Sequence, residues 1–204
     1  MQNNMGGVNA RAGEQHTQMT VDDLERLPGN GYRYELVDGG LERAQSPTSV
    51  HSLVESRLHI QLGVTAPAEY LVLQGAGVGF NADRTHHRSP DLLVIRTEDF
   101  VRPDLVKPPL LVVDVVSSTG APRDFHTEAG EYAAFGIQAY WIVNPMMHET
   151  VIDEFRLQDG GYRHERQAIG EDTFATDFPF PVKIVPHWLL AGGPWRERIG
   201  GEGA

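Results

Sequence analysis

Three short, mostly apolar runs stand out along the chain. Those at 91–95 and 110–116 are rich in valine, leucine and isoleucine, and that at 140–143 is Tyr-Trp-Ile-Val. Continuous apolar runs of this length, rather than alternating ones, predict strands that are buried on both faces of a sheet. A helical segment that ends at Gly136 separates the second run from the third, so residues 110–143 predict a βαβ unit. The chain is therefore predicted to be an α/β protein, with a mixed central sheet of five or more strands flanked by helices.

Weaker patterns predict further elements on both sides of these strands. Thr20 and Asp23 have the spacing of a capping box at the start of a short helix. A longer helix is predicted after residues 46–48. Its buried face is expected to contain Val50, Leu53, Val54, Leu58 and Leu62. The remaining predicted elements are strands at 32–37, 41–44, 70–73, 77–80, 150–157 and 162–168, and one helical turn at 187–190.

Length and composition limit the organisation of the chain. Its 204 residues are predicted to form one domain over residues 19–191, between a flexible N-terminal arm (1–18) and a flexible Gly-rich tail (192–204). The arm lacks the apolar centre of a signal peptide and the chain has no run of 18 apolar residues. We therefore expect a cytoplasmic protein without a membrane span. The absence of cysteine excludes disulfides and thiolate metal sites.

Three carboxylates, Glu35, Asp91 and Asp114, lie in or next to predicted strands. An acid among apolar residues is costly to bury unless it is paired, protonated or bound to a cation. Asp114 interrupts one apolar run and Asp91 opens another after Pro90, so a shared ligand is predicted. Oxygen-only ligands favour Mg²⁺ or Mn²⁺. Three structural interpretations stay open. Asp91 caps a loop, Asp114 forms a salt bridge to an arginine, or Glu35 occupies an exposed position on an edge strand.

Four segments in this order resemble the Uma-type restriction endonucleases, a bacterial family of the PD-(D/E)XK nuclease superfamily. They are RYELVDG at 33–39, PDLLV at 90–94, VVDVVSS at 112–118 and YAAFGIQAYWIV at 132–143. The resemblance covers residues 20–190 and implies a DNA endonuclease that hydrolyses phosphodiester bonds with Mg²⁺ or Mn²⁺. By this resemblance, Asp91, Asp114 and the backbone carbonyl of Val115 bind the ion, and Glu35 is a further ligand of the ion or of water. Such nucleases often act as dimers, which makes a homodimer one candidate state.

The chain departs from the resembled family at its lysine, because lysine occurs only at positions 107 and 183. The superfamily places a lysine two residues after the second acid, where this chain has Val116. In the resembled family the lysine is commonly on the following helix, at the position of Glu128. Two interpretations stay open. Glu128 joins the other acids around the ion of an active nuclease, or the nuclease is impaired and the fold acts as a binding module for protein or nucleic acid.

Charge and histidines add smaller expectations. The net charge of −11 counts against general affinity for nucleic acid. His51 is predicted either to contact phosphate or a carboxylate, or to be an ordinary residue on a helix face. The adjacent pair His86 and His87 is predicted to be a solvated part of a loop. Near the proposed site along the chain, His126 with Asp124 is a candidate base and Arg123 is a candidate cation.

Overall fold

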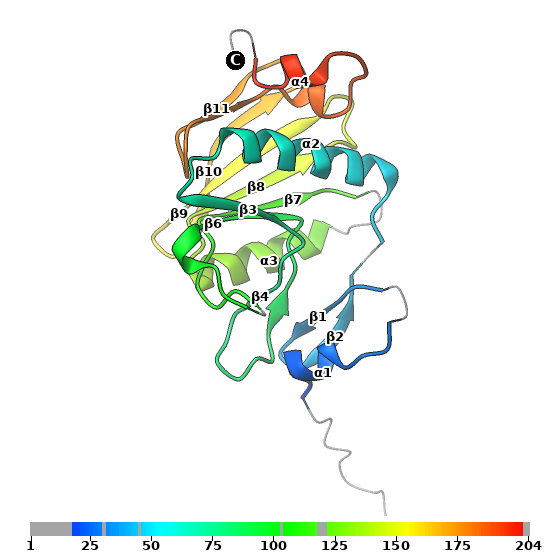
Figure 1. Cartoon of the computed structure of the whole chain (residues 1–204), viewed down its shortest axis with the longest axis vertical. Helices are drawn as coiled ribbons and strands as arrows, with labels where there is room; N and C mark the ends of the chain where they lie inside the picture. The colour runs from blue at the N-terminus through cyan, green and yellow to red at the C-terminus, as the bar shows by residue number, and fades with distance from the viewer. Residues whose placement is uncertain (1–17, 30–31, 45, 103, 118–121, 202–204) are drawn as a thin grey trace, which may run out of the picture.

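A six-stranded mixed sheet forms the centre of the computed structural model, which describes residues 18–29, 32–44, 46–102, 104–117 and 122–201 (Figure 1). Its strand order is β10-β9-β8-β7-β6-β3. The strands are β3 (Tyr70–Gln74), β6 (Leu92–Arg96), β7 (Leu111–Val115), β8 (Ala139–Asn144), β9 (Val151–Gln158) and β10 (Gly161–Ile169). Strands β7 and β8 are parallel and are joined by α3 (Pro122–Phe135), whereas the other neighbours are antiparallel. The predicted α/β class and the predicted βαβ unit are therefore confirmed.

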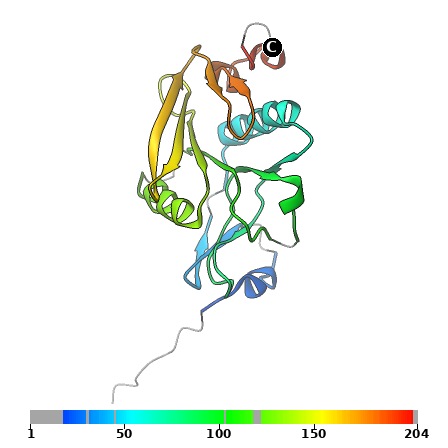
Figure 2. The ribbon, with the colours of Figure 1, turned by 90° about the vertical axis from the view of Figure 1, so that its left-hand side faces the viewer.

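Helices α2 (Ser49–Thr65) and α3 lie on opposite sides of this sheet (Figure 2). Successive side chains of a strand point to opposite faces, so each central strand contributes to both hydrophobic clusters. The prediction that Val50 and Leu53 are buried is wrong, because they are 36% and 38% exposed. The buried face of α2 is instead rotated toward His51 and Glu55, which are 7% and 6% exposed.

A second, smaller sheet has the order β2-β1-β5-β4. Its strands are β1 (Tyr34–Val37), β2 (Gly40–Arg43), β4 (Val78–Gly79) and β5 (His87–Arg88). The β1–β2 hairpin was predicted. Its turn contains Asp38 and Gly39 at φ 50° and 78°, where glycine is favoured. Strand β5 was not predicted, and the expectation that His86 and His87 are solvated is wrong. His87 is 5% exposed and the side chain of His86 is 13% exposed. Neighbouring segments of the chain cover both residues.

The remaining elements are short helices, turns and one hairpin. Helix α1 (Val21–Glu25) follows the predicted capping pattern, since Asp23 Oδ2 accepts a hydrogen bond from the Thr20 backbone N at 3.0 Å. A 3-10 turn, η1 (Thr97–Asp99), follows β6. The chain closes with the hairpin β11 (Phe174–Thr176) and β12 (Val182–Ile184), the 3-10 turn η2 (Pro186–Leu189) and helix α4 (Trp195–Arg198).

The C-terminal segment corrects one expectation about domain organisation. Residues 192–204 were expected to form a flexible tail, but residues 192–201 contain α4 and pack against the main core. Ile199 is only 1% exposed and its carbonyl accepts a hydrogen bond from the Val185 backbone N at 2.7 Å. Residues 1–17 of the expected arm and residues 202–204 of the expected tail lie outside the described part of the chain. Across the described ranges, no helix combines the length and the apolar character needed to cross a membrane.

Candidate functional site

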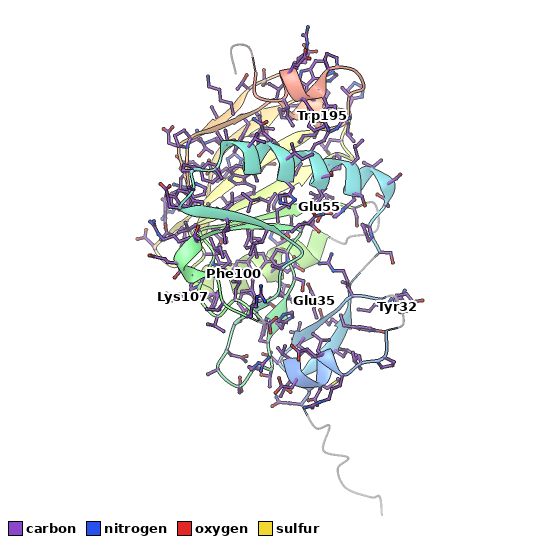
Figure 3. The ribbon with its side chains drawn as sticks, viewed as in Figure 1. Tyr32, Glu35, Glu55, Phe100, Lys107 and Trp195 are labelled. Carbon is purple, nitrogen blue, oxygen red and sulfur yellow. The ribbon has the colours of Figure 1, made fainter. Side chains whose placement is uncertain are left out.

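A cleft of about 360 Å³ opens where the small sheet meets the edge of the central sheet. Its walls come from β1 and β2, the first turn of α2, the ends of β6 and β7, and α3. The five residues that were predicted to lie around the ion all line this cleft: Glu35, Asp91, Asp114, Val115 and Glu128. Figure 3 labels Glu35 beside the small sheet and Glu55 just below α2. Residues separated by more than 90 positions along the chain therefore meet in one concave site.

Antiparallel pairing of β6 with β7 places Asp91 across from Asp114. Leu92 pairs with Val113, and one further step in the same register brings the two aspartates opposite each other. The Oδ2 atom of Asp91 accepts a hydrogen bond from the Val115 backbone N at 2.7 Å and lies 3.0 Å from His51 Nε2. Asp91 is thus held by β7 on one side and by α2 on the other.

Asp114 is the most deeply buried acid of the cleft, at 8% exposure, and Tyr140 donates a hydrogen bond to its Oδ2 at 2.9 Å. Burial raises the pKa of Asp114 well above its ordinary value of 3.8, and the carboxylates of Glu128 and Asp91 raise this pKa further. The Tyr140 hydroxyl opposes the shift. Asp114 and the two carboxylates beside it form a donor set that fits a hard divalent cation, because a cation would favour the charged form of Asp114.

This raised pKa predicts how stability depends on pH in the absence of metal. Above pH 3.8 the unfolded chain releases the Asp114 proton while the folded protein retains it, so the free energy of unfolding falls as pH rises until Asp114 ionises in the fold. The slope for one proton is about 1.4 kcal/mol per pH unit. We expect Asp114→Asn in EDTA to give a shallower decrease of the melting temperature with pH than the wild type. Equal slopes in thermal melts across this range would contradict the raised pKa.

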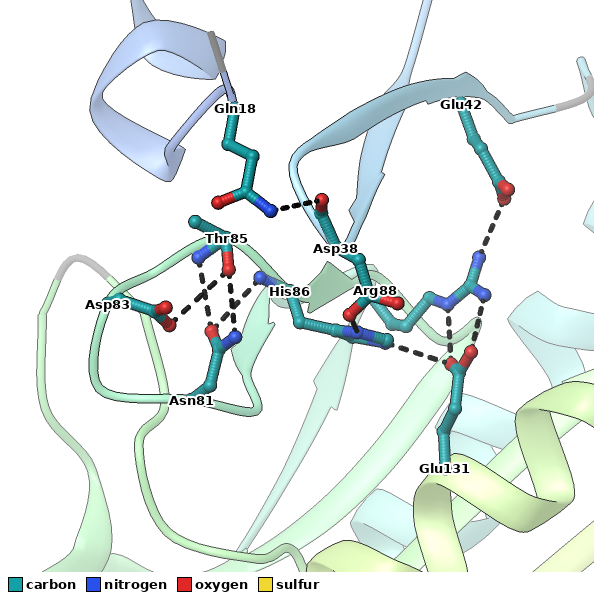
Figure 4. A network of polar contacts seen from close by, with 9 residues as sticks. All are labelled: Gln18, Asp38, Glu42, Asn81, Asp83, Thr85, His86, Arg88 and Glu131. Carbon is teal, nitrogen blue, oxygen red and sulfur yellow. Dashed lines mark hydrogen bonds and ion pairs between the residues drawn. The ribbon is translucent and has the colours of Figure 1, made fainter. Parts of the chain in front are cut away.

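Glu35 belongs to a polar network around Arg88, and Figure 4 shows the contacts of Arg88 with Glu42 and Glu131 in this network. Arg88 donates hydrogen bonds to Glu35 at 3.0 Å, to Glu42 at 3.1 Å and to both oxygens of Glu131 at 2.8 and 3.0 Å. Although burial opposes ionisation, the hydrogen bonds that Arg88 donates to Glu131 and Glu35 raise its pKa. The other oxygen of Glu35 accepts a hydrogen bond from the Ser89 backbone N at 2.8 Å. Both Glu35 oxygens therefore fix the segment that leads into Asp91.

The network predicts a large stability effect at Arg88, whose side chain is 6% exposed. Replacing Arg88 with methionine leaves the carboxylates of Glu35 and Glu131 without their cation, and breaking a buried pair costs about 3–5 kcal/mol. Chemical denaturation should show a loss near this range. Arg163→Met removes an arginine from an exposed pair with Asp159 and should change stability by less than about 0.5 kcal/mol. Similar losses in the free energy of unfolding for the two variants would show that the Arg88 network does not stabilise the contact between the small sheet and α3.

Sequence reasoning missed two features of the site. Glu55 was not nominated, although it lies one helical turn after His51 on a face with Val54 and Leu58, and this i, i+4 spacing is the signal that identifies it. Arg88 was also missed, because its partners come from three different segments. His126 is exposed and does not line the cleft.

Positive charge at the cleft comes from arginine. None of the described residues that line it is a lysine, and the side chains of Arg123 and Asp124 lie outside the described residues. Arg33 and Arg43 lie on the exposed rim formed by the small sheet, and Arg33 donates a hydrogen bond to the Ser89 carbonyl at 2.7 Å. Two exposed arginines thus lie at the rim of the cleft that contains the buried acids.

Comparison with known proteins gives two similarities. The family model described as "Uma2: Putative restriction endonuclease" matches residues 21–183. A crystal structure from Anabaena variabilis ATCC 29413, described as "a putative nuclease belonging to DUF820", matches with a TM-score of 0.60 at 15% sequence identity. The match covers 76% of this chain and 85% of that chain, and at this identity it shows a shared fold. No curated protein matches the chain.

Proposed function

Because the chain belongs to the Uma2 family, whose description and fold are those of nucleases, we propose that it is a metal-dependent DNA endonuclease acting at this cleft. The observation that carries the proposal is the meeting of four acids from separate segments in one cleft. Of these, Asp91 and Asp114 are opposite each other on adjacent strands and Asp114 is buried. Packing of the hydrophobic core alone gives no reason to gather four carboxylates in one cleft.

Asp91, Asp114 and the Val115 carbonyl hold the divalent cation, Mg²⁺ or Mn²⁺, in this proposal, and Glu128 lies beside it. When bound, such a cation neutralises charge that develops on the phosphate and lowers the pKa of water. Tyr140 fixes the orientation of Asp114 through its hydroxyl. Glu35 acts as a positioning residue, since both of its oxygens hold the segment at Arg88 and Ser89.

DNA is the proposed substrate, and the rim arginines supply its electrostatic contact. Arg33 and Arg43 are exposed at the mouth of the cleft, where guanidinium groups bind phosphate oxygens in a bidentate manner. The net charge of −11 keeps this affinity low and sensitive to salt. A homodimer is part of the same proposal, because two copies place two clefts on two strands.

A second candidate function is a binding module with weakened catalysis. It is favoured by one observation, namely that no lysine is present among the described residues lining the cleft. Under this alternative the acids retain the cation and the rim retains nucleic acid or a protein partner, while hydrolysis is slow.

Plasmid cleavage tests the proposal. Supercoiled DNA is incubated with the full chain in Mg²⁺, Mn²⁺ or EDTA, and the nicked and linear products are separated on a gel. We expect cleavage only with a divalent cation, and linear products if the chain acts as a dimer. Asp114→Asn should remove the activity. Asp153→Asn is the control, because Asp153 belongs to the central sheet and accepts a hydrogen bond from Gln167, but does not line the cleft.

The outcomes separate the two candidates. Cleavage that persists in EDTA or in Asp114→Asn would place the chemistry elsewhere and overturn the first proposal. Cation-dependent DNA binding without detectable cleavage would instead favour the binding module. Gel shifts with the same plasmid cut into short duplexes measure this binding.

A further inference from the structure

Helix α2 buries its charged residues and exposes apolar ones. Glu55 and Arg57, the only acidic and basic residues of the helix apart from histidines, are 6% and 9% exposed. Four large apolar side chains on its outer face are much more exposed. They are Val50, Leu53, Ile60 and Val64, at 36%, 38%, 39% and 76%. A helix that borders water normally has the opposite distribution, and a helix that is apolar on all sides is normally covered on all sides.

The rest of the outer face of α2 is small and uncharged. The other exposed residues of the helix are Ser49, Ser52, Ser56, Gly63 and Thr65. No exposed residue of α2, which lies entirely in the described part of the chain, is therefore acidic or basic. In Figure 1 this helix runs in front of the central strands. A face of this kind stands out in a chain in which 22% of all residues are charged.

The uncharged surface continues beside the middle of α2, over residues 190–195. This segment has no acidic or basic residue. Arg57 donates hydrogen bonds to the carbonyls of Trp188 and Ala191 at 2.9 and 2.8 Å, and its guanidinium lies 4.7 Å from the centre of the Trp195 ring. The segment therefore lies against α2 and covers its one arginine. We call the exposed residues of α2, together with residues 190–195, the α2 face.

We propose that the α2 face is the interface of a homodimer, in which the α2 helices of two copies pack antiparallel about a two-fold axis. Such an interface requires one patch that is complementary to itself. Leu53 and Ile60 lie at nearly equal spacing on either side of Ser56, and Val50 and Val64 lie beyond them. Antiparallel packing therefore places Leu53 against the partner's Ile60. The small side chain of Ser56 lies at the crossing point, where it lets the two helices approach closely.

Charge and size favour a second copy as the occupant. Each copy carries a net charge of −11, so two copies repel each other at most orientations and meet best at an uncharged face. A 17-residue helix is about 26 Å long and 10 Å wide. One side of α2 thus supplies roughly a third of the ~800 Å² that each partner buries in a standard interface. The adjoining residues 190–195 extend this area.

This inference deepens the homodimer of the proposed function and rests on it for the association of two copies, but it does not depend on the chemistry of the cleft. Sedimentation velocity of the full chain over a range of concentrations tests it. We expect a dimer for the wild type. Leu53→Glu should raise the dimer dissociation constant at least about a hundredfold, because the symmetric interface would bury the unpaired charge twice. Leu41→Glu is the matched control, since Leu41 is 39% exposed on β2, and it should leave the dimer unchanged.

Disulfide crosslinking tests the antiparallel arrangement with milder substitutions. The chain has no cysteine, so an introduced one has no competitor. Ser56→Cys should form a linked dimer on oxidation, because residues near the axis face their own copies at the Cα separation of about 4.4–6.8 Å that a disulfide needs. Val50→Cys is the control on the same helix. Its two copies would be about 20 Å apart in an antiparallel pair, so it should remain unlinked on a non-reducing gel.

The outcomes separate the interface from the chemistry. A wild type that stays monomeric at every concentration, or a dimer that Leu53→Glu leaves unchanged, would overturn the proposed interface. Linkage through Val50→Cys, or none through Ser56→Cys, would overturn the antiparallel packing. A dimer that passes these tests but cuts no DNA would leave the interface intact and overturn the proposed chemistry. If circular dichroism shows that Leu53→Glu disturbs the fold, Ile60→Glu and the cysteine variants decide.

Discussion

Replacing Asp91 with alanine should abolish cation-dependent DNA cleavage, with a loss on the order of 10³-fold or more. Asp91 is the carboxylate that lies between β7 and α2, in contact with the Val115 backbone N and His51. Metal ions contribute several kcal/mol of charge stabilisation in the transition state, and each 1.36 kcal/mol is a factor of ten in rate. Single-turnover cleavage of a labelled duplex, with Mg²⁺ and with Mn²⁺, measures the loss directly.

Asp153→Ala is the matched control for this variant. Asp153 is also an aspartate of the central sheet with protein partners, His164 and Gln167, each at 2.8 Å. It should retain wild-type cleavage, and circular dichroism should show that both variants are folded. A rate within tenfold of wild type for Asp91→Ala would remove Asp91 from the reaction, and with it the proposed arrangement of ligands.

Glu128→Lys should accelerate cleavage by roughly 10²–10³-fold, the contribution often measured for one well-placed charge-stabilising group. Glu128 is on α3, lines the cleft and lies close enough to Asp114 to raise its pKa. A lysine at this position would put an ammonium group beside the attacking water and the phosphate. The same change should also lower the pKa of Asp114, because an opposite charge replaces a like one.

The control for this gain is Glu69→Lys, which makes the same change of charge at an exposed position outside the cleft. Its effect should be limited to a modest increase in DNA affinity that disappears as salt is added. If the wild type already cuts rapidly and Glu128→Lys slows it, then Glu128 is a working ligand and the site is not weakened.

The central architecture could be predicted because its signals are local. The run around Asp114 is apolar on both faces of the sheet, and the helix ending at Gly136 joins it to a parallel neighbour, as the pattern indicated. The same apolar runs made the acids conspicuous, since a charge within a buried strand has few explanations. The family to which the chain belongs was therefore recognisable from four segments.

What could not be predicted depends on contacts between distant residues. Arg88 is separated from Glu35, Glu42 and Glu131 by 53, 46 and 43 positions along the chain. Its neighbours in the sequence are polar, so they do not predict a buried strand. The rotation of α2 toward Glu55 is similar. This rotation brings His51 into contact with Asp91, which is 40 positions away in the sequence. The spacing of apolar residues along the helix does not predict that contact.

Strand β2 has a consequence for how such a site can change its target. All four of its residues are exposed, and among the described strands it is hydrogen-bonded only to β1. Substitutions at exposed positions usually alter stability by less than about 0.5 kcal/mol. Except at Glu42, which accepts a hydrogen bond from Arg88, this outer edge can therefore be redesigned, or exchanged for that of a relative, to select a different nucleic acid. Asp91 and Asp114 lie instead at the central sheet, so selectivity for a nucleic acid can be engineered without altering either carboxylate.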